Sequence, residues 1–353
     1  MKRVGVAGTA VGLAGCLGGV GGGGGGGGGS KPDSITFGTW GGTWQDLCIK
    51  AAIDPFREET GVNVNYVLGS EDRFNKLIAQ KSNPPMHLDQ QGLANLQRGA
   101  AEGLYRELDS DILPIYADIP DKLKGDRWVA HHFTASSLVY NTDTFDEPPQ
   151  DMSVYLDEEY KGRVALAEPT QRTPNYDLMA FSLYQTDGET FKDVEAAFEM
   201  YEEIVKTMNP KFAGATEQYG KWFSNDEIDL ARIWAARSAS WQADGTPIDY
   251  QIPKNGAVMY SAGHGIPANI DEGMVEWAGR LGEYFYKPEA SREFATTMFY
   301  PTVNPVVEYP ENVQQSVPLM EDIESLQLPD YQWMGENQAE WTERANGIIN
   351  KYS

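Results

Sequence analysis

Cysteine and histidine are scarce in this chain. Its 353 residues include only two cysteines, Cys16 and Cys48, and four histidines. Two cysteines form at most one disulfide, so the fold must depend on a hydrophobic core. Cys48 lies among apolar neighbours, and we expect it to be a small core residue. The signatures of serine hydrolases (G-x-S-x-G), zinc peptidases (H-E-x-x-H) and phosphate-binding loops are absent, so we expect no catalytic residues and no cofactor.

The histidines do not predict a metal site. His131 and His132 are neighbours in an expected strand, where successive side chains point to opposite faces, so we expect that they do not share one ion. His87 and His264 remain, and two histidines are too few for a transition-metal centre.

Positive charge is also scarce. Lysine and arginine number 28 against 52 acidic residues, which gives a formal net charge of −24. Nucleic acids bind basic surfaces, so this composition excludes them as partners. The acids are spread along the whole chain, which predicts an acidic surface all round. Such a surface suits very salty surroundings, and we favour a halophilic source over an ordinary acidic exported protein.

Long apolar runs are missing, and the N-terminus carries a short one. Lys2 and Arg3 precede a small, apolar stretch at 4–15, which predicts a secretory signal at residues 1–15. The tetrapeptide Leu13-Ala14-Gly15-Cys16 resembles the lipobox of prokaryotic lipoproteins, and the resemblance implies lipidation of Cys16. Residues 16–33, rich in glycine, would then be a flexible tether. The alternative is an ordinary signal peptide with an incidental cysteine.

The rest of the chain, from residue 34, alternates strands and helices. The pattern predicts a strand at 34–37, a helix from Thr43 to Gly61, a strand at 62–68, a helix at 72–81, a strand at 86–89 and a helix at 93–102. A second α/β pattern begins at Val164, with a helix at 194–208, strands at 230–234, 248–252 and 258–261, and a final helix at 336–352. The alternation predicts parallel sheets, and the length favours two lobes.

Four motifs occur in one order along this region: "DPFREETGVNVNY", "EEYKGRVALAEP", "GTPIDYQIPKNGAVMY" and "FYPTVNP". Together they resemble the extracellular solute-binding proteins of ABC importers, most closely the spermidine/putrescine-binding branch. The resemblance implies an α/β, two-lobe periplasmic-binding-protein-like fold with a ligand cleft between the lobes. It assigns 34–138 and 264–302 to lobe 1, and 139–263 and 303–353 to lobe 2, with crossings near 136–140 and 260–266.

The resemblance also implies a role. A solute-binding protein has no catalysis of its own and delivers a small solute to a permease driven by an ATPase. With a lipid anchor it would lie on the extracytoplasmic face of the membrane, and we expect a monomer.

The family's ligand contacts map onto particular positions. Four aromatic residues, Trp40, Trp234, Tyr260 and Tyr300, match rings that wall the ligand slot, although each alone could be a core residue. Asp89 and Gln90 match polar contacts, or they cap a helix. Glu168 matches an acidic contact, or it is a turn residue before Pro169.

Two positions depart from the polyamine pattern. A family aspartate is replaced by Ala262, and a second acid aligns with Arg172. Arg237 lies near the same region, and an arginine in a cleft recognises carboxylate or phosphate. A polyamine such as spermidine or putrescine stays the first candidate. A zwitterionic amino acid or aminophosphonate is the alternative, and an exported hydrolase of a small substrate is a second alternative.

Overall fold

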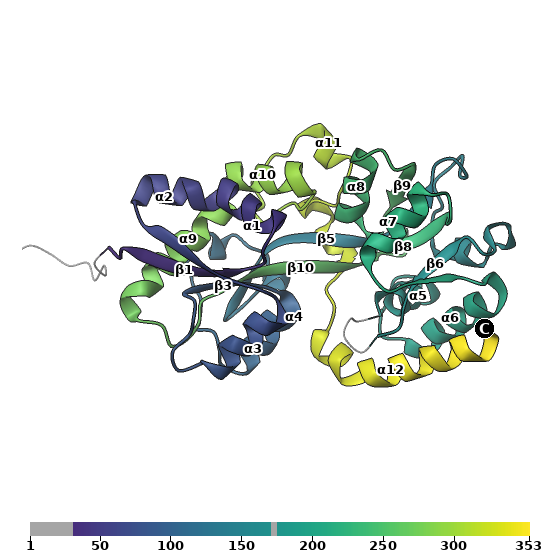
Figure 1. Cartoon of the computed structure of the whole chain (residues 1–353), viewed down its shortest axis with the longest axis horizontal. Helices are drawn as coiled ribbons and strands as arrows, with labels where there is room; N and C mark the ends of the chain where they lie inside the picture. Colours follow the sequence, from purple (N-terminus) through teal and green to yellow (C-terminus); the bar gives the residue numbers. More distant parts are fainter. Residues whose placement is uncertain (1–30, 171–174) are drawn as a thin grey trace, which may run out of the picture.

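The computed structural model describes residues 31–170 and 175–353, which form two α/β lobes side by side (Figure 1). Cys16 and Arg172, two residues that the sequence singled out, lie outside the described residues. The strands are β1 (Ser34–Thr39), β2 (Asn63–Leu68), β3 (Leu88–Gly92), β4 (Lys124–Gly125), β5 (Trp128–Asn141), β6 (Val164–Ala167), β7 (Lys211–Ala213), β8 (Leu230–Trp234), β9 (Ile248–Gln251), β10 (Ala257–Gly265) and β11 (Leu326–Gln327).

Helices cover both sheets. They are α1 (Thr43–Cys48), α2 (Asp54–Thr60), α3 (Glu71–Ala79), α4 (Leu93–Ala101), α5 (Tyr176–Gln185), α6 (Val194–Met208), α7 (Thr216–Ser224), α8 (Ala235–Ala243), α9 (Glu272–Tyr286), α10 (Pro288–Met298), α11 (Glu311–Gln314) and α12 (Tyr331–Tyr352). Among the described residues, no helix combines the length and the apolar character needed to cross a bilayer.

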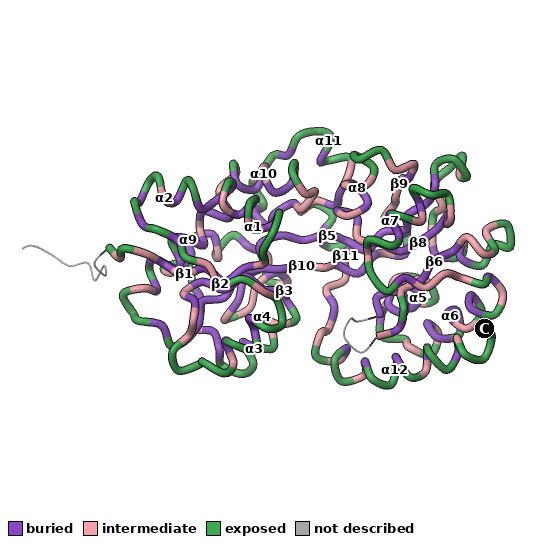
Figure 2. Tube along the Cα trace, viewed as in Figure 1, coloured by how far each residue is buried: buried purple, intermediate pink, exposed green. Residues whose placement is uncertain are grey.

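Two long strands connect the lobes. The sheet order is β2-β1-β3-β10-β5 in lobe 1 and β5-β8-β6-β7 in lobe 2. The first part of β5 pairs antiparallel with β10, and its last part pairs with β8 and β9. All 14 residues of β5 are buried, and the strand runs through the middle of the molecule (Figure 2). The two-lobe α/β fold predicted from the sequence is confirmed.

Each lobe has its own core. The lobe 1 cluster extends along β5 as far as Ala135, and the lobe 2 cluster begins at Leu138. Val303, Ile323 and Leu326 pack into the lobe 1 core, whereas α12 packs into the lobe 2 core. Cys48 is fully buried in lobe 1, as predicted, and burial raises the pKa of its thiol.

The helix predicted from Thr43 to Gly61 is interrupted. A π-helical turn at Ile49–Ile53 separates α1 from α2, so the helix is not a continuous α-helix. Its end at Gly61 is confirmed, because Gly61 has φ 66° and adopts the left-handed conformation that closes helices. The start at Thr43 is also confirmed, with Gly42 in the N-cap position. The final helix starts at Tyr331, five residues before the predicted start.

The expectation that His131 and His132 point to opposite faces is wrong. His132 pairs with Ala262 and Ala130 pairs with Gly263, so His131 is the extra residue of a β-bulge. The bulge turns the two rings together, with 3.0 Å between their Nδ1 atoms. His131 Nε2 lies 3.1 Å from the Phe285 carbonyl oxygen, so its Nδ1 accepts from His132. Both rings are neutral, and burial lowers the pKa of His131 to about 3.

The packing of α9 on lobe 1 yields a stability prediction. A Cβ at Gly279 would lie 1.9 Å from the Ile112 carbonyl oxygen, so Gly279→Ala should cost about 3 kcal/mol of unfolding free energy through overpacking. Gly273, in the first turn of the same helix, has nothing within 4 Å of a built Cβ. Gly273→Ala should therefore be neutral or stabilising by up to about 1 kcal/mol. Urea unfolding of both variants tests this, and equal stabilities would contradict the packing.

Candidate ligand-binding site

The predicted lobe 2 contacts meet at one edge of the sheet. Trp234 ends β8, and Glu168 directly follows β6, which is parallel to β8. The register pairs Ala165 with Ala231, and Glu168 and Trp234 are each three residues further along these two strands, so the same register continued would set them level. Parallel strands end at the same edge, where ligands of α/β sheets bind. Trp40 follows β1 in the corresponding position of lobe 1.

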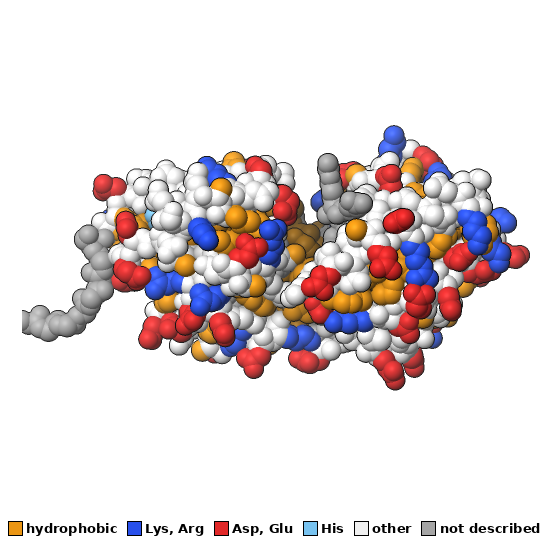
Figure 3. All heavy atoms as spheres, turned by 90° about the horizontal axis from the view of Figure 1, so that it is seen from below, with side chains coloured by type: hydrophobic (Ala, Val, Ile, Leu, Met, Phe, Trp, Pro, Cys, Tyr) orange, Lys and Arg blue, Asp and Glu red, His pale blue; other side chains and the backbone are white. Residues whose placement is uncertain are grey.

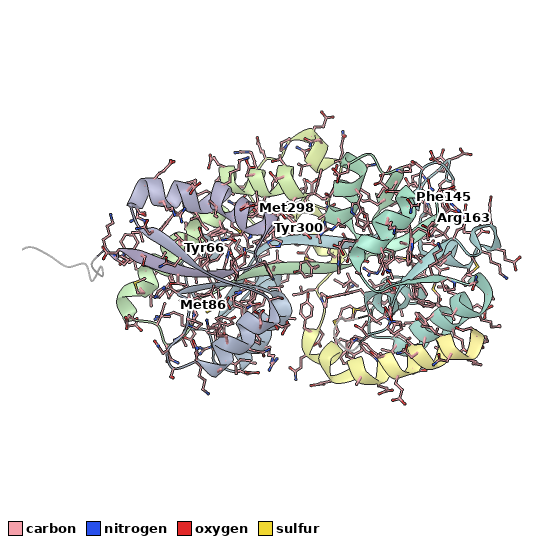
Figure 4. All side chains as sticks on the ribbon, viewed as in Figure 1. Tyr66, Met86, Phe145, Arg163, Met298 and Tyr300 are labelled. Atoms are coloured by element: carbon pink, nitrogen blue, oxygen red, sulfur yellow. The ribbon has the colours of Figure 1, made fainter. Side chains whose placement is uncertain are left out.

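Two clusters of aromatic rings contain the four predicted aromatic residues. The Trp234 ring lies 4.8 Å from Tyr176 and 5.6 Å from Tyr260, measured between centroids. In lobe 1, Trp44 lies 5.8 Å from Trp40 and 5.9 Å from Tyr300. Tyr300 is above β5, near the junction of the lobes (Figure 4). The four predicted aromatic residues are therefore all in ring clusters that flank the crossing strands.

The tyrosine hydroxyls of these clusters are protonated at neutral pH. Burial raises the pKa of Tyr260, and the nearby Tyr300 and Tyr176 raise it further. Burial also raises the pKa of Tyr300, although Arg237 opposes this shift. Each hydroxyl can thus donate a hydrogen bond to a ligand.

A cavity of about 620 Å³ lies between the lobes, with α4 on one side and the first turns of α12 on the other. Tyr331, from α12, lines this cavity and packs against the cores of both lobes. Its neighbours Tyr176 and Tyr260 add to the burial that raises its pKa. A hollow bordered by hydrophobic side chains is visible between the lobes (Figure 3). Tyr331 therefore links this interlobe cavity to the rings of Tyr176 and Tyr260.

Asp89 and Gln90 are occupied by protein partners. Asp89 forms a fully buried ion pair with Arg73 and accepts a hydrogen bond of 2.7 Å from the Tyr105 hydroxyl. The Gln90 side-chain oxygen accepts from Thr39 at 2.7 Å and from Trp44 at 2.8 Å. These contacts tie β3 to the surrounding helices and support the wall of the cleft.

The Asp89 pair yields a second prediction. Asp89→Asn leaves the buried Arg73 guanidinium without its counter-charge, so the free energy of unfolding should fall by about 3–5 kcal/mol. Asp226→Asn is the control, because that carboxylate is largely exposed although it also pairs with an arginine. It should cost less than about 1 kcal/mol. Chemical denaturation measures both, and a small loss for Asp89→Asn would contradict the structural role.

Glu168 is exposed, and its side chain lies against Gly214. Its backbone N–H donates to the Ala213 carbonyl, which fixes the start of the loop after β6. Arg237, in the first turn of α8, lines a small cavity with Tyr300 and Met298. Among the described residues, no group of three or more histidine, cysteine or acidic side chains is arranged to hold a metal ion.

The sequence reasoning missed Tyr176, Tyr331 and Arg232. The first two lie at helix starts, after Asn175 and Asp330, whose side chains cap α5 and α12. These N-cap residues were available signals. Arg232 sits within an apolar strand, where its alternation with Trp234 was the available sign that both face the same side.

Two lobes joined by crossing strands, with a cleft between them, define a two-lobe binding protein of the periplasmic type. The family described as bacterial extracellular solute-binding protein matches residues 51–321, and this chain belongs to it. It is an extracellular solute-binding protein of the ABC-transporter type. The spermidine/putrescine-binding periplasmic protein of Escherichia coli K12 is 26% identical over 275 residues, 74% of this chain and 76% of that protein.

Solved structures share the fold. An extracellular solute-binding protein from Bordetella parapertussis has a TM-score of 0.79 at 20% identity, covering 91% of this chain and 98% of its own. A structure described as the Atu4243–GABA receptor has a TM-score of 0.72 at 16% identity, covering 90% and 97%. At these identities the likeness concerns the fold alone.

Proposed function

We propose that this protein captures a small amine-containing solute between its lobes and delivers it to an ABC permease. The observation that carries the proposal is that Trp234, whose ring lies 5.6 Å from Tyr260, and Glu168 stand at the ends of the neighbouring parallel strands β8 and β6. An ammonium leaving water needs a carboxylate or a ring face to replace its hydration, and this edge supplies both. Asp89 and Gln90 are left out of the proposed contacts because protein groups occupy them.

Spermidine or putrescine is the first candidate ligand. The supporting observation is the Escherichia coli relative, whose name states this ligand class. The rings of Trp40, Trp234, Tyr260 and Tyr300 suit a methylene chain with cationic ends.

A zwitterionic amino acid or aminophosphonate is the second candidate. It is favoured because Ala262, in the position of a carboxylate in polyamine binders, is buried and carries no charge. Loss of that carboxylate removes the partner of one ammonium.

The proposal includes the remaining sequence expectations. The sequence assigned 34–138 and 264–302 to lobe 1, and 139–263 and 303–353 to lobe 2. We propose that the last crossing lies between Leu326 and Met334, because Leu326 packs in the lobe 1 core and Met334 in the lobe 2 core. Cys16 is proposed as the lipidated mature N-terminus, which intact-mass analysis of membrane-extracted protein tests. The protein is proposed to act as a monomer without catalysis.

A thermal-shift screen in high salt tests the function. Putrescine, spermidine and 4-aminobutyrate are the solutes, and a ligand at 100 times its Kd should add about 2.7 kcal/mol of stability. A higher Tm with at least one solute, recovered unchanged afterwards, is the expected result. No shift with any of them, or conversion of the solute, would contradict the proposal.

A further inference from the structure

We infer that the lobe 2 end of the slot recognises an acidic group on the ligand through the guanidinium of Arg232. This inference rests on the proposed function and chooses between its two candidate ligands. Arg232 lies on β8 two residues before Trp234, so both side chains leave the same face of the strand. Its guanidinium carbon is 5.3 Å from the Trp234 ring centroid and 5.8 Å from that of Tyr176. The positive charge of Arg232 therefore lies directly behind the rings of Trp234 and Tyr176.

The guanidinium has an unused donor. Arg232 Nε pairs with Asp177 Oδ1, and the other oxygen of that carboxylate accepts from the Ala167 N–H at 2.7 Å. Arg232 Nη1 is buried and has no hydrogen-bond partner among the described residues. The whole side chain is more than nine-tenths buried. An arginine can only donate, so what this site lacks is an acceptor oxygen.

The polar groups around Arg232 that lack a partner are hydrogen-bond donors, and they add no negative charge. The hydroxyls of Tyr155 and Tyr219 are buried without partners in the described part of the chain, and burial raises the pKa of each although the Arg232 charge opposes this shift. Asp177 is the one carboxylate that pairs with Arg232 here, and both of its oxygens are occupied. A carboxylate or phosphonate fits such surroundings, because planar or forked oxygen pairs match a guanidinium.

The spacing suits a short zwitterion. The continued register would set Glu168 level with Trp234, and Arg232 is two residues deeper along β8. Two residues of a strand span about 6.8 Å, which is near the separation of the charged ends of a short amino acid. We expect the acidic end to pass beside the Trp234 ring, which is only partly buried, while Glu168 holds the amine over that ring. A polyamine would instead bring an ammonium toward the guanidinium.

Calorimetric titration of the full chain in high salt tests the inference. The probes are 4-aminobutyrate, 2-aminoethylphosphonate, putrescine and spermidine. The variant is Arg232→Met with Asp177→Asn, so that no buried carboxylate is left unpaired. The matched control is Arg163→Met with Asp229→Asn, since Arg163 pairs with the buried Asp229 and with Asp226 at the outer end of lobe 2 (Figure 4).

The wild type should bind an acidic probe, and the double variant should lose at least 30-fold in that affinity while the control loses less than threefold. If the double variant does not fold, Arg232→Lys, which keeps the charge without the fork, should lose about tenfold. Tight polyamine binding that the double variant leaves unchanged or strengthens, with no binding of the acidic probes, would overturn the inference and support the proposed function. Absence of binding by all four probes would overturn both.

Discussion

Replacing Trp234 with alanine should weaken binding of the amine-containing ligand about 100-fold. The ring is the lobe 2 wall of the proposed slot and lies 5.6 Å from Tyr260 and 4.8 Å from Tyr176. A desolvated cation over a ring is stabilised by about 2 kcal/mol or more, and loss of the buried ring area adds to this. About 2.7 kcal/mol corresponds to the 100-fold change. Calorimetry with whichever solute raises the Tm measures it.

Trp222→Ala is the matched control for this prediction. Trp222 is also partly buried in lobe 2, but it packs against a separate core cluster that contains Tyr219 and Phe223, and Lys211 lies over its ring. Its loss should leave ligand affinity within about threefold. If both variants lose affinity equally, the slot at Trp234 is not the binding site.

The second large effect is a loss of stability in mild acid. His131, His132 and His264 are buried on β5 and β10, and burial lowers the pKa of each, to about 3 for His131. Below pH 6.5 the unfolded chain takes up protons at these positions and the folded chain does not. Each histidine then costs about 1.4 kcal/mol of stability per pH unit, and the three together about 4 kcal/mol. Stability is therefore greatest above pH 6.5 and falls toward pH 3.

Urea unfolding in high salt at pH 7.0 and pH 5.5 measures this effect. The free energy of unfolding should be lower by about 4 kcal/mol at pH 5.5, a window above the range where most carboxylates titrate. His264→Gln should retain the contacts to Gln90 and Tyr286 and remove one titrating group. Between pH 7.0 and pH 5.5 this variant should lose about 1.4 kcal/mol less unfolding free energy than the wild type. An equal loss of unfolding free energy in the wild type and the variant would show that His264 does not contribute to the pH dependence.

The sequence was most informative about the positions of strand ends. Trp40 directly follows one strand and Trp234 is the last residue of another, and residues in these positions reach the edge of a parallel sheet whatever the connections between the strands. The α6 helix was predicted with its observed bounds because its apolar residues repeat at helical spacing, and in the structure Asp193 caps its start.

The hydrogen-bond partners of Asp89 and Gln90 could not be predicted from the residues next to them in the sequence. Arg73, which pairs with Asp89, is on a helix 16 residues earlier, and Trp44, which donates to Gln90, is 46 residues earlier. A polar residue at a strand end serves a ligand or a core partner depending on such distant groups. The same holds for the bulge at His131, which arises from the pairing of β5 with β10 and has no local signature.

The central claim is that the solute is bound between the lobes, and small-angle X-ray scattering tests it most directly. Ligand that touches both lobes favours their closed arrangement. With a saturating solute, verified by calorimetry on the same sample, the radius of gyration of the wild type should decrease. The Trp234→Ala variant at the same solute concentration should show no decrease. An unchanged radius of gyration in the saturated wild type would contradict binding by closure of the two lobes.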